Sequence, residues 1–105
     1  MYAYLPTSTV HGTSFGRGSW SFGPGRWISI EQHVRLNTPG VADGLIEIVV
    51  DGVQVLRVSD VVFRSVASLK IEGVFFSTFF GGDDTSWATP QTVRADFADL
   101  SLAHA

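Results

Sequence analysis

The feature that most constrains the fold of this chain is a hairpin signal near its middle. Residues 45–50 and 53–58 are two runs rich in β-branched side chains, and only Asp51 and Gly52 separate them. An Asp-Gly pair between two such runs favours a type I′ turn, in which both central residues adopt positive φ. We therefore predict two antiparallel strands joined by this turn.

Residues 27–36, just before the hairpin, show the clearest alternation of side chains. One face is mainly apolar and carries Ile28, Ile30, Gln32, Val34 and Leu36. The other face is mainly polar and carries Trp27, Ser29, Glu31, His33 and Arg35. Because successive side chains of a strand point to opposite faces, this pattern predicts an antiparallel strand with one face towards water.

Further strands are expected along the chain, and no segment sustains a helical period. They are predicted at residues 2–5, 19–22, 68–80 and 92–102, with a loop at 7–18 and a turn at Gly23-Pro24-Gly25. The 68–80 run is apolar on both faces towards its end, which predicts a central, covered strand with a bulge at Gly73. Residues 61–64 are expected to form another short strand or an irregular segment. Short strands separated by turn signals indicate an all-β antiparallel sandwich or jelly roll, in a single domain over residues 1–105.

Composition excludes several classes of protein. The chain is 45% hydrophobic and 16% charged, so it has enough apolar surface to fold. Its net charge is −3 and its basic residues are scattered, which argues against nucleic acid as a partner. No run is long enough for a transmembrane helix, so we expect no membrane partner. The absence of cysteine excludes disulfides and thiolate chemistry.

Tyr2 and Tyr4 form a Tyr-x-Tyr pair in the first predicted strand. Their spacing places both phenols on one face, where one can act as a base and the other as an acid on the same substrate. On the residue pattern alone, ordinary strand aromatics are the commoner explanation, since Tyr is favoured in strands.

The polar face of residues 27–36 is a second candidate site. His33 can act as a general base and Arg35 can pair with a carboxylate, with Glu31 beside them. A strand face exposed to solvent explains the same pattern without any function, and on strand statistics it is the commoner case.

Metal and sugar-stacking sites have weaker signals. Asp83 and Asp84 could ligate calcium, although a Gly-Gly-Asp-Asp run more often forms a turn. The three histidines are too dispersed for zinc, so we expect neither a metal nor a cofactor. Trp20, Trp27 and Trp87 could form a sugar-stacking platform or could all lie in the core.

Several runs, in order, resemble the family 14 polysaccharide lyases over nearly the whole chain. The most specific is residues 75–80, Phe-Phe-Ser-Thr-Phe-Phe, followed by Gly81 and Gly82. The supporting runs are residues 16–22, 25–27, 32–40, 51–55, 87–90 and 97–102. The resemblance implies a β-jelly roll with a concave cleft and β-elimination on a polyuronate such as alginate or glucuronan.

The resemblance also implies roles for particular residues. Tyr2 and Tyr4 match the catalytic Tyr-x-Tyr pair of the family by their place in the chain, and Gln32, His33 and Arg35 are predicted to bind the substrate. A Lys and a Ser-x-Arg pair would precede the tyrosines. We therefore expect the chain to be the N-terminally truncated, C-terminal half of a lyase domain, with slowed elimination because those cations are missing.

Other expectations follow from an incomplete jelly roll. Exposed sheet edges and an uncovered apolar face promote self-association. The parent enzyme would be secreted, although no signal peptide is visible in the chain. Two alternatives stay open: a carbohydrate-binding β-sandwich module without catalysis, and a structural β-domain whose aromatic residues are all core.

Overall fold

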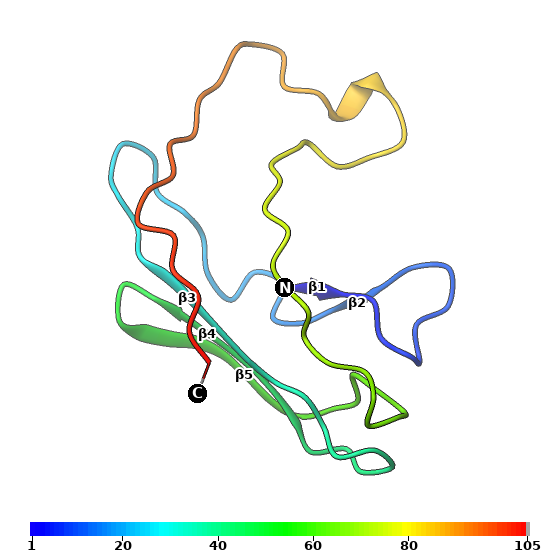
Figure 1. Cartoon of the computed structure of the whole chain (residues 1–105). Helices are drawn as coiled ribbons and strands as arrows, with labels where there is room; N and C mark the ends of the chain where they lie inside the picture. Colours follow the sequence, from blue (N-terminus) through cyan, green and yellow to red (C-terminus); the bar gives the residue numbers. More distant parts are fainter. Residues whose placement is uncertain (105) are drawn as a thin grey trace. The chain divides into compact units, whose positions relative to one another are not determined.

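The computed structural model describes residues 1–104 and shows an all-β protein with antiparallel sheets. The chain divides into two compact units, Met1–Glu72 and the residues from Gly73 onward, and each is described by itself. All five strands belong to the first unit (Figure 1). Within residues 1–104, no helix is long and apolar enough to cross a bilayer.

A three-stranded antiparallel sheet forms the body of the first unit. It consists of β3 (Ile30–Arg35), β4 (Gly44–Val50) and β5 (Val53–Val61), in the order β3-β4-β5 (Figure 1). The predicted hairpin is confirmed, and the strand expected at residues 27–36 is confirmed in its central part. Asp51 and Gly52 have φ of 49° and 79°, the left-handed values that a type I′ turn needs.

The core of this sheet is small and lies on one face of its central strand. Ile46, Ile48 and Val61 are the buried hydrophobic residues of the described chain. On the same face, Ile30 and Val34 of β3 lie opposite Val50 and Ile46. Ile30 nevertheless remains 54% exposed, so the apolar face predicted for this strand is covered only in part.

A second, two-stranded sheet precedes the first. β1 (Tyr2–Ala3) pairs antiparallel with β2 (Thr13–Ser14), and Tyr2 lies opposite Ser14. The predicted first strand is therefore shorter than residues 2–5, and the segment expected to be a loop at 7–18 contains β2. The Phe15 N–H donates to the Met1 carbonyl at 2.7 Å and extends the pairing by one residue.

Three predicted strands are absent from the described residues. Segments 19–22, 68–80 and 92–102 carry no strand, and Gly73 marks no bulge. A strand needs a neighbour for its N–H and C=O groups, and alternation alone cannot supply one. The run expected to be a covered strand is exposed instead, with Phe75 at 92% and Phe79 at 82%.

The second unit, described to residue 104, follows an extended path with one short 3₁₀ turn, η1 (Thr85–Trp87) (Figure 1). The Asp84 carboxylate caps this turn by accepting from the Ser86 N–H at 2.8 Å. The pair Asp83-Asp84 therefore lies at a turn, which is the commoner of the two explanations considered above. The Phe76 and Phe97 rings meet edge to face at 4.9 Å.

Candidate functional site

The structure brings the side chains of Tyr2 and Tyr4 together. Tyr2 belongs to β1, and Tyr4 follows that strand, two residues before Pro6 ends the extended segment. Their ring centroids lie 5.4 Å apart at an interplanar angle of 85°, which is an edge-to-face contact. Both rings are exposed, Tyr2 at 51% and Tyr4 at 73%, so neither phenol is withdrawn into the core.

Gly12 fixes the position of the Tyr2 phenol. Its N–H donates to the Tyr2 Oη at 2.6 Å. A Cβ at this position would lie 2.6 Å from the Ala3 carbonyl oxygen and 2.9 Å from Tyr2 Cε1. Only glycine therefore leaves room for the ring to reach the backbone of the loop between β1 and β2.

The Tyr2 side chain shifts the pKa of Tyr4. Hydrogen bonding to the Tyr2 side chain raises the pKa of Tyr4 above its ordinary value, and charge repulsion from Tyr2 and partial desolvation act in the same direction. Tyr4 therefore keeps its proton at neutral pH, as a proton donor must.

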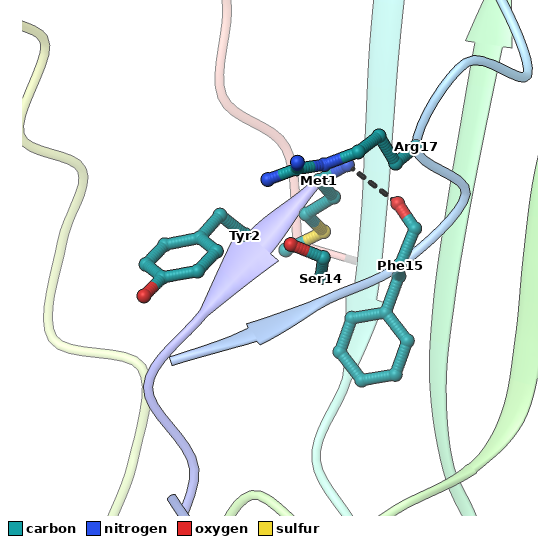
Figure 2. Close-up of a pocket in the computed structure, with 5 residues that line it drawn as sticks. All are labelled: Met1, Tyr2, Ser14, Phe15 and Arg17. Carbon is teal, nitrogen blue, oxygen red and sulfur yellow. Dashed lines mark hydrogen bonds between the residues drawn. The ribbon is translucent and has the colours of Figure 1, made fainter. Parts of the chain in front are cut away.

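Tyr2 also lines an open pocket of about 300 Å³. The other lining residues are Met1, Ser14, Phe15 and Arg17 (Figure 2). Ser14 lies directly across the two-stranded sheet from Tyr2, and Arg17 supplies the pocket with a guanidinium. Tyr2, Ser14 and Arg17 thus line one opening, and the hydroxyl end of the Tyr2 ring points away from Arg17 (Figure 2).

Arg17 is held by the turn that follows β2. Gly16 and Gly18 on either side of it have φ of 59° and 82°, and the Ser19 N–H closes the turn on the Gly16 carbonyl at 3.1 Å. A Cβ at Gly16 would lie 2.7 Å from Leu56 Cδ1, so the turn packs directly on β5. The sequence predicted no role for Arg17, because the pairing of β1 with β2 and the packing of Gly16 on Leu56 bring it to the pocket with Tyr2.

The three predicted substrate-binding residues of β3 do not line this pocket, and they divide between the two faces of their sheet. Gln32 lies on the same face as the apolar residues Ile30 and Val34, whereas His33 and Arg35 share the opposite face. Arg35 Nη2 donates to the Asp43 carbonyl at 3.1 Å. Their role in binding stays a prediction.

His33 lies between two carboxylates. Its Nε2 is 3.5 Å from Glu31 Oε2, and its Nδ1 is 3.5 Å from Glu47 Oε2. Glu47 also pairs with Arg57 on the next strand. On this face Glu31 and Glu47 offset Arg35 and Arg57, whereas Arg17 lines its pocket without an acidic side chain beside it among the described residues. The pocket with Arg17 therefore offers the greater net attraction to a polyanion.

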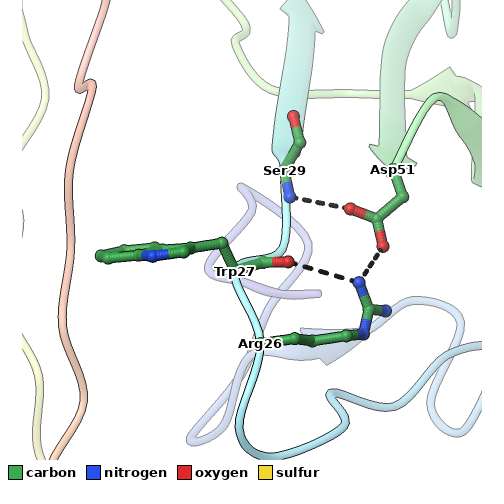
Figure 3. Close-up of polar contacts among 4 residues, drawn as sticks. All are labelled: Arg26, Trp27, Ser29 and Asp51. Atoms are coloured by element: carbon green, nitrogen blue, oxygen red, sulfur yellow. Dashed lines mark hydrogen bonds and ion pairs between the residues drawn. The ribbon is translucent and has the colours of Figure 1, made fainter.

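A further polar cluster anchors the hairpin turn to the segment before β3 (Figure 3). Arg26 Nη1 lies 2.7 Å from Asp51 Oδ2, and the Ser29 N–H donates to Asp51 Oδ1 at 2.9 Å. The Arg26 hydrogen bond, the Ser29 amide and the Arg26 charge together hold the pKa of Asp51 below its ordinary value. Trp27, next in the chain, is 69% exposed and lies outside the core, as does Trp87 at 62%.

Among residues 1–104, no group of three or more His, Asp or Glu side chains is arranged to hold a metal ion.

Comparison with known proteins identifies the class. The family model described as polysaccharide lyase 14 matches residues 2–100, and the chain belongs to this family. No curated protein and no solved structure matches it. Membership gives the chain the general character of a lyase domain with a polysaccharide substrate.

Proposed function

We propose that the pocket of Tyr2 and Arg17 binds a uronate residue of an acidic polysaccharide, such as alginate or glucuronan, and supports β-elimination there. The observation that carries this proposal is the pocket itself, because Tyr2 and Arg17 both line one opening. Arg17 would pair with the uronate carboxylate, because a guanidinium matches a carboxylate in shape and charge.

The reaction needs three groups. A base takes the C5 proton, and the electron pair of the broken C5–H bond forms the C4–C5 double bond. The C4–O glycosidic bond breaks, and an acid protonates the departing oxygen. Neutralising the carboxylate stabilises the negative charge that develops as the C5 proton leaves.

The two tyrosines would divide the proton transfers. Tyr4 contacts the Tyr2 ring without itself lining the pocket, and its pKa is raised, so it holds its proton and is suited to protonate the leaving oxygen. Tyr2 lies in the pocket with Arg17, and its oxygen already accepts a hydrogen bond from the Gly12 N–H. We therefore assign the removal of the C5 proton to Tyr2.

An assay of the unsaturated uronate product tests this proposal. The ultraviolet absorbance of the new double bond should rise when the protein is incubated with alginate or glucuronan. Arg17→Gln should lower kcat/KM by about 10²–10³-fold, the usual cost of losing one preorganised electrostatic contact. Arg94→Gln is the matched control, since Arg94 is exposed and pairs with Asp96 in the other unit. Equal rates for both variants would contradict the assignment of Arg17.

The competing function is carbohydrate binding without catalysis. The 69% exposure of Trp27 favours it, because an exposed indole can stack on a sugar ring. Titration with oligouronates separates the two functions. Binding that survives Tyr2→Phe and Tyr4→Phe, with no absorbance rise for the wild-type protein, would favour a binding module and overturn the lyase proposal.

A polysaccharide is too large to cross a membrane unaided, so the proposed reaction would take place outside the cell. Detection of the protein in the culture medium of its source tests this placement.

A further inference from the structure

β3 is an edge strand of the main sheet. Within the described residues it pairs with β4 alone, and its other edge has no strand beside it. All of its residues except Val34 are exposed. An edge of this kind presents unpaired N–H and C=O groups, which can pair with a strand from another chain.

The backbone geometry shows which residues face this open edge. The Ser29 carbonyl accepts from the Asp51 N–H at 2.9 Å and so points towards the β4 side. The direction of the backbone N–H and C=O groups alternates along an antiparallel strand. Those of Glu31, His33 and Arg35 therefore also point towards β4. The N–H and C=O groups of Ile30, Gln32 and Val34 therefore point to the open edge.

The order of charges along β3 is complementary to the same order on a second β3 that runs antiparallel to it. Glu31, His33 and Arg35 place an acid and a base at equal distances on either side of a histidine, on one face of the strand. We infer that β3 pairs antiparallel with β3 of a second copy of this chain, about a two-fold axis at His33. Glu31 of each copy then lies opposite Arg35 of the other.

The backbone agrees with this register. With His33 opposite His33, Gln32 and Val34 of the two copies form the hydrogen-bonded pairs, and these residues carry edge-facing groups. Glu31 and Arg35 then form the non-hydrogen-bonded pairs, in which side chains lie closer together. A shift by one pair would place Glu31 or Arg35 opposite a histidine and lose both complementary ion pairs.

The apolar face gains from the same pairing. Ile30 of one copy lies opposite Leu36 of the other, and the two sheets become one continuous sheet. Ile30, which is 54% exposed in the single chain, acquires an apolar neighbour. A two-fold axis of this kind closes the assembly as a dimer at this edge and leaves no free β3 edge to continue.

Sedimentation equilibrium of the purified chain tests this inference. The wild-type protein should be dimeric. Glu31→Arg places Arg opposite Arg35, and Arg35→Glu places Glu opposite Glu31, so each single change should raise the dimer Kd by about tenfold. The combined variant with both substitutions should recover the wild-type Kd, because the reversed charges are again complementary.

The controls carry the same changes of charge elsewhere. Glu72→Arg and Lys70→Glu alter exposed residues outside β3 and should leave the Kd unchanged. Circular dichroism of each variant checks that the fold is intact. A monomeric wild-type chain would overturn the inference. Single reversals that leave the Kd unchanged, or a combined variant that fails to recover it, would also overturn the pairing through β3.

Discussion

The rings of Tyr2 and Tyr4 meet edge to face, with their centroids 5.4 Å apart. Hydrogen bonding to Tyr2 is the main reason why the pKa of Tyr4 is raised, followed by charge repulsion from Tyr2. Removing the Tyr2 hydroxyl with Tyr2→Phe should therefore lower the pKa of Tyr4 towards its ordinary value of about 10.

The sequence makes this measurement unambiguous. The chain has only two tyrosines, so Tyr2→Phe leaves Tyr4 as the sole phenol in a spectrophotometric titration. The upper titration step of the wild-type chain is the reference. A Tyr4 titration in the variant at or above that step would contradict the proposed coupling of the two phenols.

The Asn37 side chain joins two segments of the first unit through its hydrogen bonds. It is fully buried, and its Nδ2 donates to the carbonyls of Thr38, Val41 and Arg64 at 3.0, 3.1 and 3.0 Å. Its Oδ1 accepts from the N–H groups of Phe63 and Arg64 at 2.8 and 2.9 Å. The side chain thus joins the end of β3 to the segment after β5.

Asn37→Ala should lower the free energy of unfolding by about 3–5 kcal/mol, because it leaves several buried backbone groups without partners. Urea denaturation followed by circular dichroism measures the loss. The exposed Gln54→Ala on β5 is the control and should change stability by no more than about 0.5 kcal/mol. Similar midpoints for the two variants would show that Asn37 does not join these segments in solution.

Asp51 should make stability depend on pH. The pKa of Asp51 is lowered in the folded chain, chiefly by the hydrogen bond from Arg26. A lowered pKa means that the folded state binds the proton less readily than the unfolded state does. The carboxylate therefore contributes stability above the unfolded carboxyl pKa of about 4, and this contribution is lost as the pH falls through the folded value.

Asp51→Asn keeps the shape of the side chain and tolerates the positive φ of this turn position. Its urea midpoint should be lower than that of the wild-type chain at pH 7, and the difference should shrink below about pH 4. Asp60→Asn, an exposed carboxyl on β5, is the control. A wild-type advantage that stays constant down to acid pH would contradict the ion pair as its source.

Position 44 has no room for a side chain larger than that of glycine. It is buried at the start of β4, and a Cβ there would collide with the Val61 carbonyl oxygen and lie 2.9 Å from Phe63 Cδ2. Gly44→Ala should therefore cost about 1–3 kcal/mol of stability, as overpacking usually does.

Gly73→Ala is the matched control, because no heavy atom lies within 4 Å of a Cβ built there. Thermal unfolding of both variants measures the difference. A Gly44→Ala variant as stable as Gly73→Ala would mean that β5 and Phe63 move aside without cost.

The hairpin could be predicted from the sequence because its information is local. Asp51 and Gly52 specify the turn, and the adjacent runs specify the strands that the turn joins. The strands predicted at 68–80 and 92–102 depend instead on distant partners, and side-chain alternation contains no information about those partners. The apolar residues on both faces of 68–80 predicted a covered strand, whereas Phe75 is 92% exposed.

The candidate site, too, could be predicted from the sequence only in part. Tyr2 and Tyr4 could be identified because they are close in sequence. Arg17 could not, since the pairing of β1 with β2 and the packing of Gly16 on Leu56 together bring it to the pocket. The structural role of Asn37 could not be identified either, because its buried contacts reach residues 63 and 64, far along the chain.

The extended path of the second unit has a consequence for its resistance to cleavage. A protease must draw several residues of unpaired backbone into its active site, and strands within a hydrogen-bonded sheet cannot supply them without opening. Limited digestion should therefore cut between residues 73 and 104 well before it cuts within β4 or β5, and a resistant fragment containing the hairpin should accumulate.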